Sequence, residues 1–338
     1  MVSISDVNNA NAALKSAPSP TAVVVGGTHG IGEAFVRQLA THTASPRIYI
    51  VGRSQSLLAN LITALNSLNT SGTYIPIATP DLTLVANAHA AALDIVAQEK
   101  ASPSPKIDIL YLSPGYLTFR RRDASEEDLD RITALRYHSR MRIVLDLLPL
   151  LSKSPSPRVL TVLGAGQEGE IFPSDLALKE PEHSSAMTAV GAAMAYTTLF
   201  LEQLARRHPN IAFIHSFPGI VKTNVFNHPE HLGPVIRFLA NWVLFPLLGW
   251  LMAVPVEEAG ARCLYMLTSP EFAPAEGGDA AVAVVGSDGK KGSGAYAVNE
   301  KCEAVVNNKV LQRYREDGLD EKVWEYTMAE YERILGQT

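Results

Sequence analysis

The sequence predicts a single α/β domain built on a doubly wound parallel sheet, in three layers with helices on both faces. Short β-branched segments alternate with longer stretches of helical pattern, which is typical of strand–helix–strand units with right-handed crossovers. The expected strands are apolar along their whole length, as in residues 22–25, and this fits a sheet that is covered on both sides. We see no internal repeat and no second core along the 338 residues.

Six segments carry the strand pattern, and helices are expected between them. These segments are residues 22–25, 48–51, 74–77, 107–112, 158–163 and 211–215. After the last of them the sequence predicts a helix over 257–267, a glycine-rich, hairpin-like stretch around 286–294 and a closing amphipathic helix over 321–335. We therefore expect a flexible N-terminus over 1–20 and one domain over 21–335, which includes a C-terminal extension over 270–335.

Composition narrows the classes of partner. The net charge of -5 gives no electrostatic reason to expect nucleic acid, so a small molecule is the expected partner. Cys263 and Cys302 are the two cysteines, and they are not grouped with histidines at metal-ligand spacing. This usage suits a reducing compartment, and no basic patch followed by an apolar core opens the chain, so we expect a cytoplasmic protein without a bound metal.

One apolar segment needs its own interpretation. Residues 238–256 contain no charged side chain and are almost long enough to span a bilayer. Asn241, Pro246 and Gly249 interrupt the segment, which favours two short helical pieces over a membrane span. We expect an apolar helical lid over 230–256 that covers a hydrophobic substrate, and peripheral membrane contact stays open.

The strongest motif is a glycine-rich loop that follows the first strand and opens the first helix. Gly26, Gly30 and Gly32 have the spacing G-x-x-x-G-x-G. Glycines at this place permit a tight turn and let the pyrophosphate of a dinucleotide approach the free N–H groups of a helix N-terminus. The expected binding residues in the loop are Gly26, Thr28, His29, Gly30 and Ile31.

Arg53 indicates which dinucleotide is bound. It follows the second strand, where the adenosine ribose is expected to lie. An acidic residue there would accept a hydrogen bond from the 2′-hydroxyl of NAD, whereas a guanidinium can pair with a 2′-phosphate. The sequence therefore favours NADP(H), and His29 could approach the same phosphate.

The motifs in this order resemble those of the short-chain dehydrogenase/reductases, which have a Rossmann fold, over about residues 22–267. The resemblance rests on the glycine spacing, on Arg53, on Asp81-Leu82-Thr83 after the third strand and on residues 218–223 after the sixth. It implies that Asp81, with Leu82 beside it, contacts the adenine and that Gly115 lines the nucleotide. It also implies that Ile220 and Thr223, after the sixth strand, hold the nicotinamide carboxamide and that Pro218 and Gly219 of the same turn bind the cofactor.

The family's catalytic side chains are missing from the matching positions. Members of the family use a serine, a Tyr-x-x-x-Lys pair and an asparagine, because the lysine and cofactor lower the pKa of the tyrosine while the serine polarises the substrate oxygen. The alignment places Gly164 at the serine, Val190 at the tyrosine, Met194 at the lysine and Arg136 near the asparagine. If a proton is transferred, another group must supply it.

Three side chains are candidate replacement acids. Tyr137 and His138 lie on the helix before the fifth strand, and Tyr196 lies on the helix after it. Residues 137–142, the long stretch 164–185 and the C-terminal extension resemble a group of fungal short-chain dehydrogenase-like proteins from secondary metabolism. That resemblance implies a hydrophobic natural-product substrate, such as a polyketide or terpenoid intermediate.

Three functions remain compatible with the sequence. The first is an oxidoreductase in which NADPH reduces a carbonyl or alkene and a non-standard acid supplies the proton. The second is a non-redox cyclase, isomerase or dehydratase with a deep apolar cavity lined by lid residues Phe238, Trp242, Phe245 and Trp250. The third is a non-catalytic NADP-binding protein. The family resemblance also makes a homodimer possible, through the helices after the fourth and fifth strands.

Overall fold

The computed structural model describes residues 2–116, 118, 120–221, 254–279, 281–306 and 308–336. Within them lies a seven-stranded sheet of order β3-β2-β1-β4-β5-β6-β7, in which every neighbouring pair is parallel. The strands are β1 (Thr21–Val25), β2 (Arg47–Gly52), β3 (Thr73–Ala78), β4 (Ile109–Leu112), β5 (Arg158–Val162), β6 (Ala212–Ser216) and β7 (Ala295–Val298). The order reverses at β1 and β4, so the doubly wound fold is confirmed.

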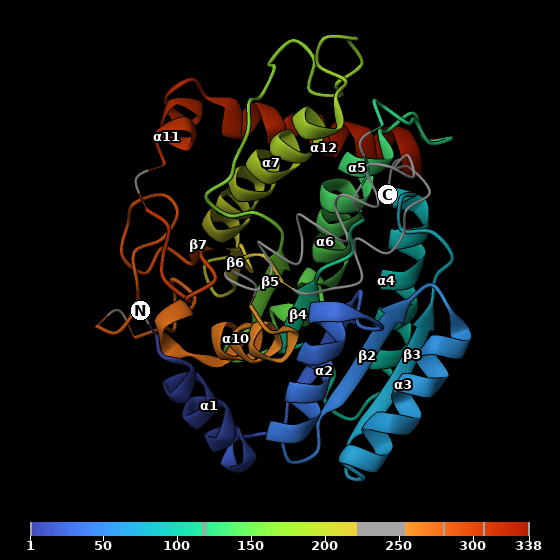
Figure 1. Ribbon diagram of the computed structural model, residues 1–338, viewed down its shortest axis with the longest axis vertical. Helices are drawn as coiled ribbons and strands as arrows, with labels where there is room; N and C mark the ends of the chain where they lie inside the picture. The colour runs from blue at the N-terminus through green and yellow to red at the C-terminus, as the bar shows by residue number, and fades with distance from the viewer. Residues whose placement is uncertain are drawn as a thin grey trace, which may run out of the picture.

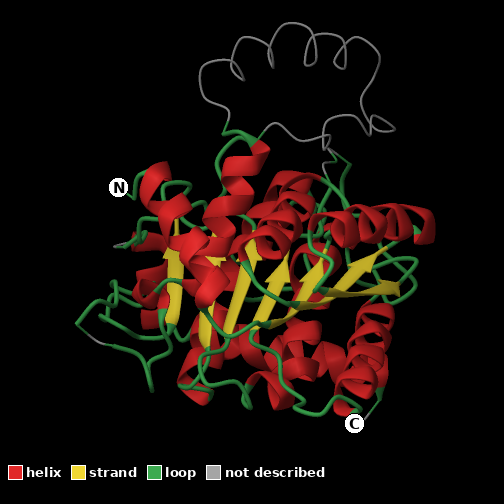
Figure 2. Ribbon diagram, turned by 90° about the horizontal axis from the view of Figure 1, so that it is seen from below, coloured by secondary structure: helices red, strands yellow, loops and turns green. Residues whose placement is uncertain are grey.

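Helices cover both faces of the sheet (Figures 1 and 2). One face carries α2 (Gly30–His42), α3 (Gln55–Leu68) and α10 (Val256–Thr268), and their apolar side chains form one core cluster with the strands. The other face carries α4 (Val85–Lys100), α6 (Ser139–Leu151) and α7 (Ala186–Arg207), which form the second cluster. The three predicted layers are therefore present in one domain.

The apolar strands are buried on both sides. Val23 and Val25 of β1 belong to one core cluster, whereas Ala22 and Val24 belong to the other. Because successive side chains of a strand point to opposite faces, a strand covered on both faces must be apolar throughout. This explains why the six predicted strands lie within two residues of the observed ones.

The seventh strand was not expected. Residues 286–294 make the predicted turn, which Val285 and Lys291 close by an antiparallel bridge, and β7 follows it directly. The strand is four residues long and pairs with β6 at the edge of the sheet. It is too short to show a period of its own, so its strand conformation depends on the neighbour that it meets.

The expectation of a flexible N-terminus is wrong. Residues Ile4–Ala13 form α1, and Ser3 caps this helix by accepting a hydrogen bond from the backbone N–H of Asp6. Val7 is fully buried, and the side-chain amide of Asn11 donates to the carbonyl of Ala261 on α10 at 2.9 Å. The N-terminal segment therefore packs on α10 as part of the domain.

The C-terminal extension is helical and lies against the body of the domain. It contains α11 (Lys309–Glu316) and α12 (Leu319–Leu335), and α12 runs across α7 (Figure 1). Trp324 of α12 stacks on Phe200 of α7 with ring centroids 4.6 Å apart. The guanidinium carbon of Arg207, also on α7, lies 4.0 Å from the Trp324 ring centroid. The extension thus covers the apolar side of α7.

The predicted lid over 230–256 lies mostly outside the described residues. Its last residues are described: Val254 bridges to Val221, and α10 begins at Val256. Among the helices that the structure describes, none combines the length and apolar character needed to cross a membrane.

Candidate functional site

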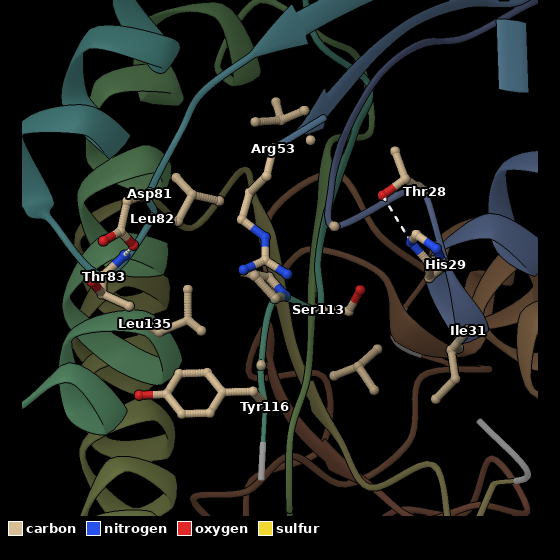
Figure 3. Close-up of a pocket in the computed structure, with 17 residues that line it drawn as sticks. Thr28, His29, Ile31, Arg53, Asp81, Leu82, Thr83, Ser113, Tyr116 and Leu135 are labelled. Carbon is tan, nitrogen blue, oxygen red and sulfur yellow. Dashed lines mark hydrogen bonds between the residues drawn. The ribbon is translucent and has the colours of Figure 1, made fainter. Parts of the chain in front are cut away.

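A cavity of about 280 Å³ opens at the carboxyl edge of the sheet, next to the point where the strand order reverses (Figure 3). Ligands of doubly wound proteins bind at this place, because the loops after the strands diverge there and leave a crevice. The cavity is lined by Gly26, Thr28, His29, Ile31, Gly32, Val51, Gly52, Arg53, Asp81, Leu82, Thr83, Ser113, Pro114, Gly115, Tyr116, Leu135 and Val162. Most of the predicted nucleotide-binding residues therefore meet in one cavity.

The glycine loop forms one wall, and its conformation depends on having no side chains. Gly26 has φ +87°, and a Cβ on Gly32 would lie 2.1 Å from the carbonyl oxygen of Gly26. Gly30, with φ +59°, begins α2, whose first-turn N–H groups have no partner within the helix. Loop and helix N-terminus together form a cradle that would fit the pyrophosphate of a dinucleotide.

Arg53 extends from the end of β2 into the cavity, between Asp81 and Leu82 on one side and Thr28 and His29 on the other (Figure 3). Its side chain is exposed and makes no salt bridge with any residue that the structure describes. The imidazole of His29 is 3.3 Å from the hydroxyl of Thr28, so the two form a hydrogen-bonded pair on the loop. An unpaired guanidinium here fits a phosphate group on the adenosine ribose.

The loop after β3 presents Asp81 and Leu82 to the cavity. One carboxylate oxygen of Asp81 accepts from the backbone N–H of Thr83 at 2.8 Å. Arg131 donates to the other Asp81 oxygen at 3.3 Å and to the hydroxyl of Thr83 at 2.7 Å. These bonds fix the loop in the shape that lets Asp81 and Leu82 line the cavity.

In the wall that follows β4 and β5, sequence reasoning identified Gly115 and missed the other residues. Ser113, Pro114 and Tyr116 come directly after β4, and Val162 is the last residue of β5. The carboxyl ends of parallel strands meet at the same edge of the sheet. The position of these residues just after predicted strands could therefore have identified them as lining the cavity.

The described residues of the turn after β6 do not line this cavity. Pro218, Gly219 and Ile220 are not among its lining residues, and the Ile220 side chain is 43% exposed. Gly219 has φ +76°, so the predicted turn is present at the carboxyl edge of the sheet. Thr223 lies outside the described residues, and the role of this turn in holding a nicotinamide stays a prediction.

The positions aligned with the family's serine and lysine are in contact. A Cβ on Gly164, which follows β5, would lie 2.4 Å from the methyl carbon of Met194 on α7. A serine at 164 would therefore require the flexible end of the Met194 side chain, at the predicted lysine position, to move. The two replacements fit each other, and neither side chain can exchange a proton.

The three candidate acids are buried and do not line this cavity, so nothing in the described structure supports a role for them in acid catalysis. Tyr137 is fully buried, with its hydroxyl 2.6 Å from that of Thr327 on α12. The hydroxyl of Tyr196 is also buried and donates to the carbonyl of Leu176 at 3.0 Å. His138 is 1% exposed and contacts the rings of α12. The C-terminal helix covers all three.

Their protonation is also unsuited to acid catalysis. Burial raises the pKa of Tyr137 and of Tyr196 well above that of a free tyrosine. Burial lowers the pKa of His138 to about 3, with a smaller contribution from the positive charge of Arg333. At pH 7 this imidazole is neutral, so it lacks the acidic proton of an imidazolium and is a very weak acid.

The buried histidines predict an acid-sensitive fold. Burial lowers the pKa of His138 and of His215 to about 3, so both stay neutral in the folded state while the unfolded chain protonates below about pH 6.5. Stability is therefore full above pH 6.5 and falls as the pH drops toward 3, by up to about 1.4 kcal/mol per pH unit for each histidine.

Urea unfolding of wild type and of His138→Phe between pH 7 and 5 measures this effect. The phenylalanine keeps the ring contacts and removes one titrating group, together with a buried Nδ1 atom that has no hydrogen-bond partner. We expect a shallower loss of unfolding free energy in the variant than in wild type. Equal pH slopes for the two proteins would contradict the assignment.

The fold and the glycine cradle define a dinucleotide-binding α/β protein, and comparison with known proteins identifies the family. The family model described as short chain dehydrogenase matches residues 20–230. The chain is 37% identical to "Oxidoreductase AN1596" of Emericella nidulans over 97% of each chain. The protein therefore belongs to the short-chain dehydrogenases, and its relatives are fungal oxidoreductases.

Solved structures agree on the fold. "MalC Reductase/Diels-Alderase" from Malbranchea aurantiaca matches with a TM-score of 0.57 at 16% identity, over 77% of this chain and 93% of that one. A short-chain dehydrogenase from Sphingobium yanoikuyae, solved in complex with NADPH, matches with a TM-score of 0.51 at 16% identity, over 73% of this chain and 83% of that one. Sequence identity at this level supports the architecture alone.

Proposed function

We propose that the protein is an NADPH-dependent reductase that acts on the carbonyl or alkene of a hydrophobic natural-product intermediate in the cytoplasm. The observation that carries this proposal is the joint placement of the glycine cradle and the unpaired Arg53 in one cavity. NADPH bound there would supply a hydride. The protein's own part is to hold the phosphates at α2 and Arg53 and to bring the substrate to the β4 and β5 end of the cleft.

The substrate class rests on the fungal relatives and on the apolar sequence 230–256, and it is a proposal. A structurally similar protein is named a reductase and Diels-Alderase, and another was solved with NADPH. Peripheral membrane contact and a homodimer also stay predictions.

A non-redox reaction is the second candidate, and the Gly164–Met194 contact favours it. No side chain at these two positions can donate a proton, and the three candidate acids are buried away from the cavity. A cyclase or isomerase that only shapes its substrate would not need such an acid. To separate the two, we would follow nicotinamide absorbance while the protein turns over a panel of hydrophobic enones. Consumption of NADPH supports the reductase, whereas product formed at constant NADPH supports the non-redox reaction.

Arg53 provides the test of cofactor choice. Replacing it with aspartate should weaken NADPH binding by about 100-fold, because a charge-assisted pair is lost and a carboxylate faces the 2′-phosphate. NADH binding should stay within a few-fold of wild type. Both dissociation constants follow from nicotinamide fluorescence, and Arg37→Ala on the exposed side of α2 serves as the control. Equal affinity of the wild-type protein for NADPH and NADH would contradict the assignment.

A further inference from the structure

Arg136 and Arg140 pack against the loop after β4, which forms one wall of the cavity. Arg140 of α6 is 1% exposed, and its guanidinium ties the ends of two strands together. It donates to the carbonyl of Pro114 at 2.6 Å, to that of Val162 at 2.8 Å and to the hydroxyl of Thr161 at 2.7 Å. Since Pro114 and Val162 line the cavity, this buried positive charge lies directly behind it.

Arg136 lies one turn earlier, on the π-helical segment η2 (Ala134–His138), and is partly exposed. It donates to the carbonyl of Tyr116 at 2.8 Å. The position that a Cβ would take on Gly115 is 3.9 Å from Nη2 of Arg140 and 4.0 Å from Nη1 of Arg136. Both guanidinium groups therefore meet the same short stretch of cavity wall.

Neither arginine has a carboxylate partner among the residues that the structure describes. The contrast with other arginines is clear, because Arg142 pairs with Asp146 and Arg315 pairs with Glu202. Burial, and then the charge of Arg136, lower the pKa of Arg140 to about 9, so it is charged at pH 7. Two neighbouring positive charges without a counter-charge are costly in a protein interior.

Arg158 is a buried arginine with a structural role, and it serves as a comparison. Like Arg140, Arg158 has no carboxylate partner among the described residues, and it donates to the carbonyls of Leu267, Ser269 and Phe272. These carbonyls lie at and just beyond the C-terminal end of α10, where the helix dipole places partial negative charge. Arg136 and Arg140 instead donate to the carbonyls of Tyr116, Pro114 and Val162, which line the cavity.

We propose that Arg136, with Arg140 behind it, forms an anion site in the cleft that binds a carboxylate group of the substrate. Arg136 is the binding residue, because its guanidinium makes one hydrogen bond in the described structure and can offer further N–H donors as a planar fork. Arg140 is a positioning residue that holds the wall and adds positive potential. The inference rests on the proposed function and narrows its substrate class to hydrophobic acids.

The test compares a carboxylate with its neutral isostere. Benzoate and benzamide have nearly the same shape, so their difference in affinity for the NADPH-saturated protein, measured by calorimetry, reports the anion site. We expect benzoate to bind wild type about tenfold more tightly than benzamide. Arg136→Gln should remove this preference and Arg136→Lys should keep part of it. Arg206→Gln removes an exposed charge on α7 and should keep all of it.

The outcomes separate this inference from the proposed function. The inference is overturned if wild type binds both probes equally or if Arg136→Gln retains the preference for benzoate. It is also overturned if Arg136→Gln weakens NADPH binding tenfold while the preference for benzoate persists. Arg136 would then bind a phosphate group of the cofactor and not a carboxylate of the substrate. If NADPH does not bind wild type, the proposed reductase fails, and the same probes measured without cofactor still decide the anion site.

Discussion

Replacing Gly32 with alanine should weaken NADPH binding by about 100-fold, because the new methyl group has no room in the glycine loop. Its carbon would lie 2.1 Å from the carbonyl oxygen of Gly26 and 3.1 Å from the hydroxyl of Ser113. The first contact is with backbone, so relief requires that the loop or the start of α2 moves. Either movement displaces the N–H groups that would face a pyrophosphate.

The measurement is a fluorescence titration with NADPH, with urea unfolding of the same preparation to show that the domain is folded. Glu33→Ala is the matched control, because Glu33 is the next residue of α2 and its carboxylate only pairs with Arg37 at the surface. That control should bind NADPH within about twofold of wild type, since an exposed pair contributes little. Binding by Gly32→Ala at wild-type strength would show that the cradle is not the nucleotide site.

The glycine loop could be predicted because its requirements are local. The turn, the positive φ of Gly26 and the start of α2 all lie within a few residues of the chain. The strands could be predicted for a similar reason, since burial on both faces leaves an uninterrupted apolar segment such as β1. The cavity then follows from the rule that parallel strands end at one edge.

The positions of Tyr137, His138 and Tyr196 could not be predicted in the same way. Their environment is set by α12, and the hydrogen bond from Tyr137 reaches Thr327, which is 190 residues away in sequence. Amphipathic helices show which face is apolar and not which element will cover it. The π-helical turn that places Arg136 has no local sequence pattern either, because it depends on the packing around it.

The helix α1 is a different case, because its signal was present in the sequence. Ser3 and Asp6 have the spacing of an N-cap pair, and the Ser3 hydroxyl also donates to the Asp6 carboxylate at 2.6 Å. The segment looks polar because it buries only Val7 and Asn11. A polar composition therefore concealed a capped helix that needs only two contact residues.

Removing the ring of Tyr331 should destabilise the protein by about 3–5 kcal/mol, the usual cost of truncating a buried aromatic side chain. Tyr331 is 2% exposed on α12, faces His138 and lies under the guanidinium of Arg142, 5.5 Å from its ring centroid. Urea unfolding of Tyr331→Ala measures the loss. Met328→Ala, which changes an exposed residue of the same helix, should stay within about 0.5 kcal/mol of wild type.

The hydroxyl of Tyr331 links this stability to the proposed anion site. It donates to the carbonyl of His138 at 2.6 Å, at the end of the π-helical turn that carries Arg136. Tyr331→Phe keeps the ring and should cost about 1 kcal/mol, the net value of one hydrogen bond. If α12 holds that turn in place, Tyr331→Phe should also reduce the preference for benzoate over benzamide while NADPH binding is unchanged. If Tyr331→Phe lowers stability without changing that preference, then α12 stabilises the fold but does not position Arg136.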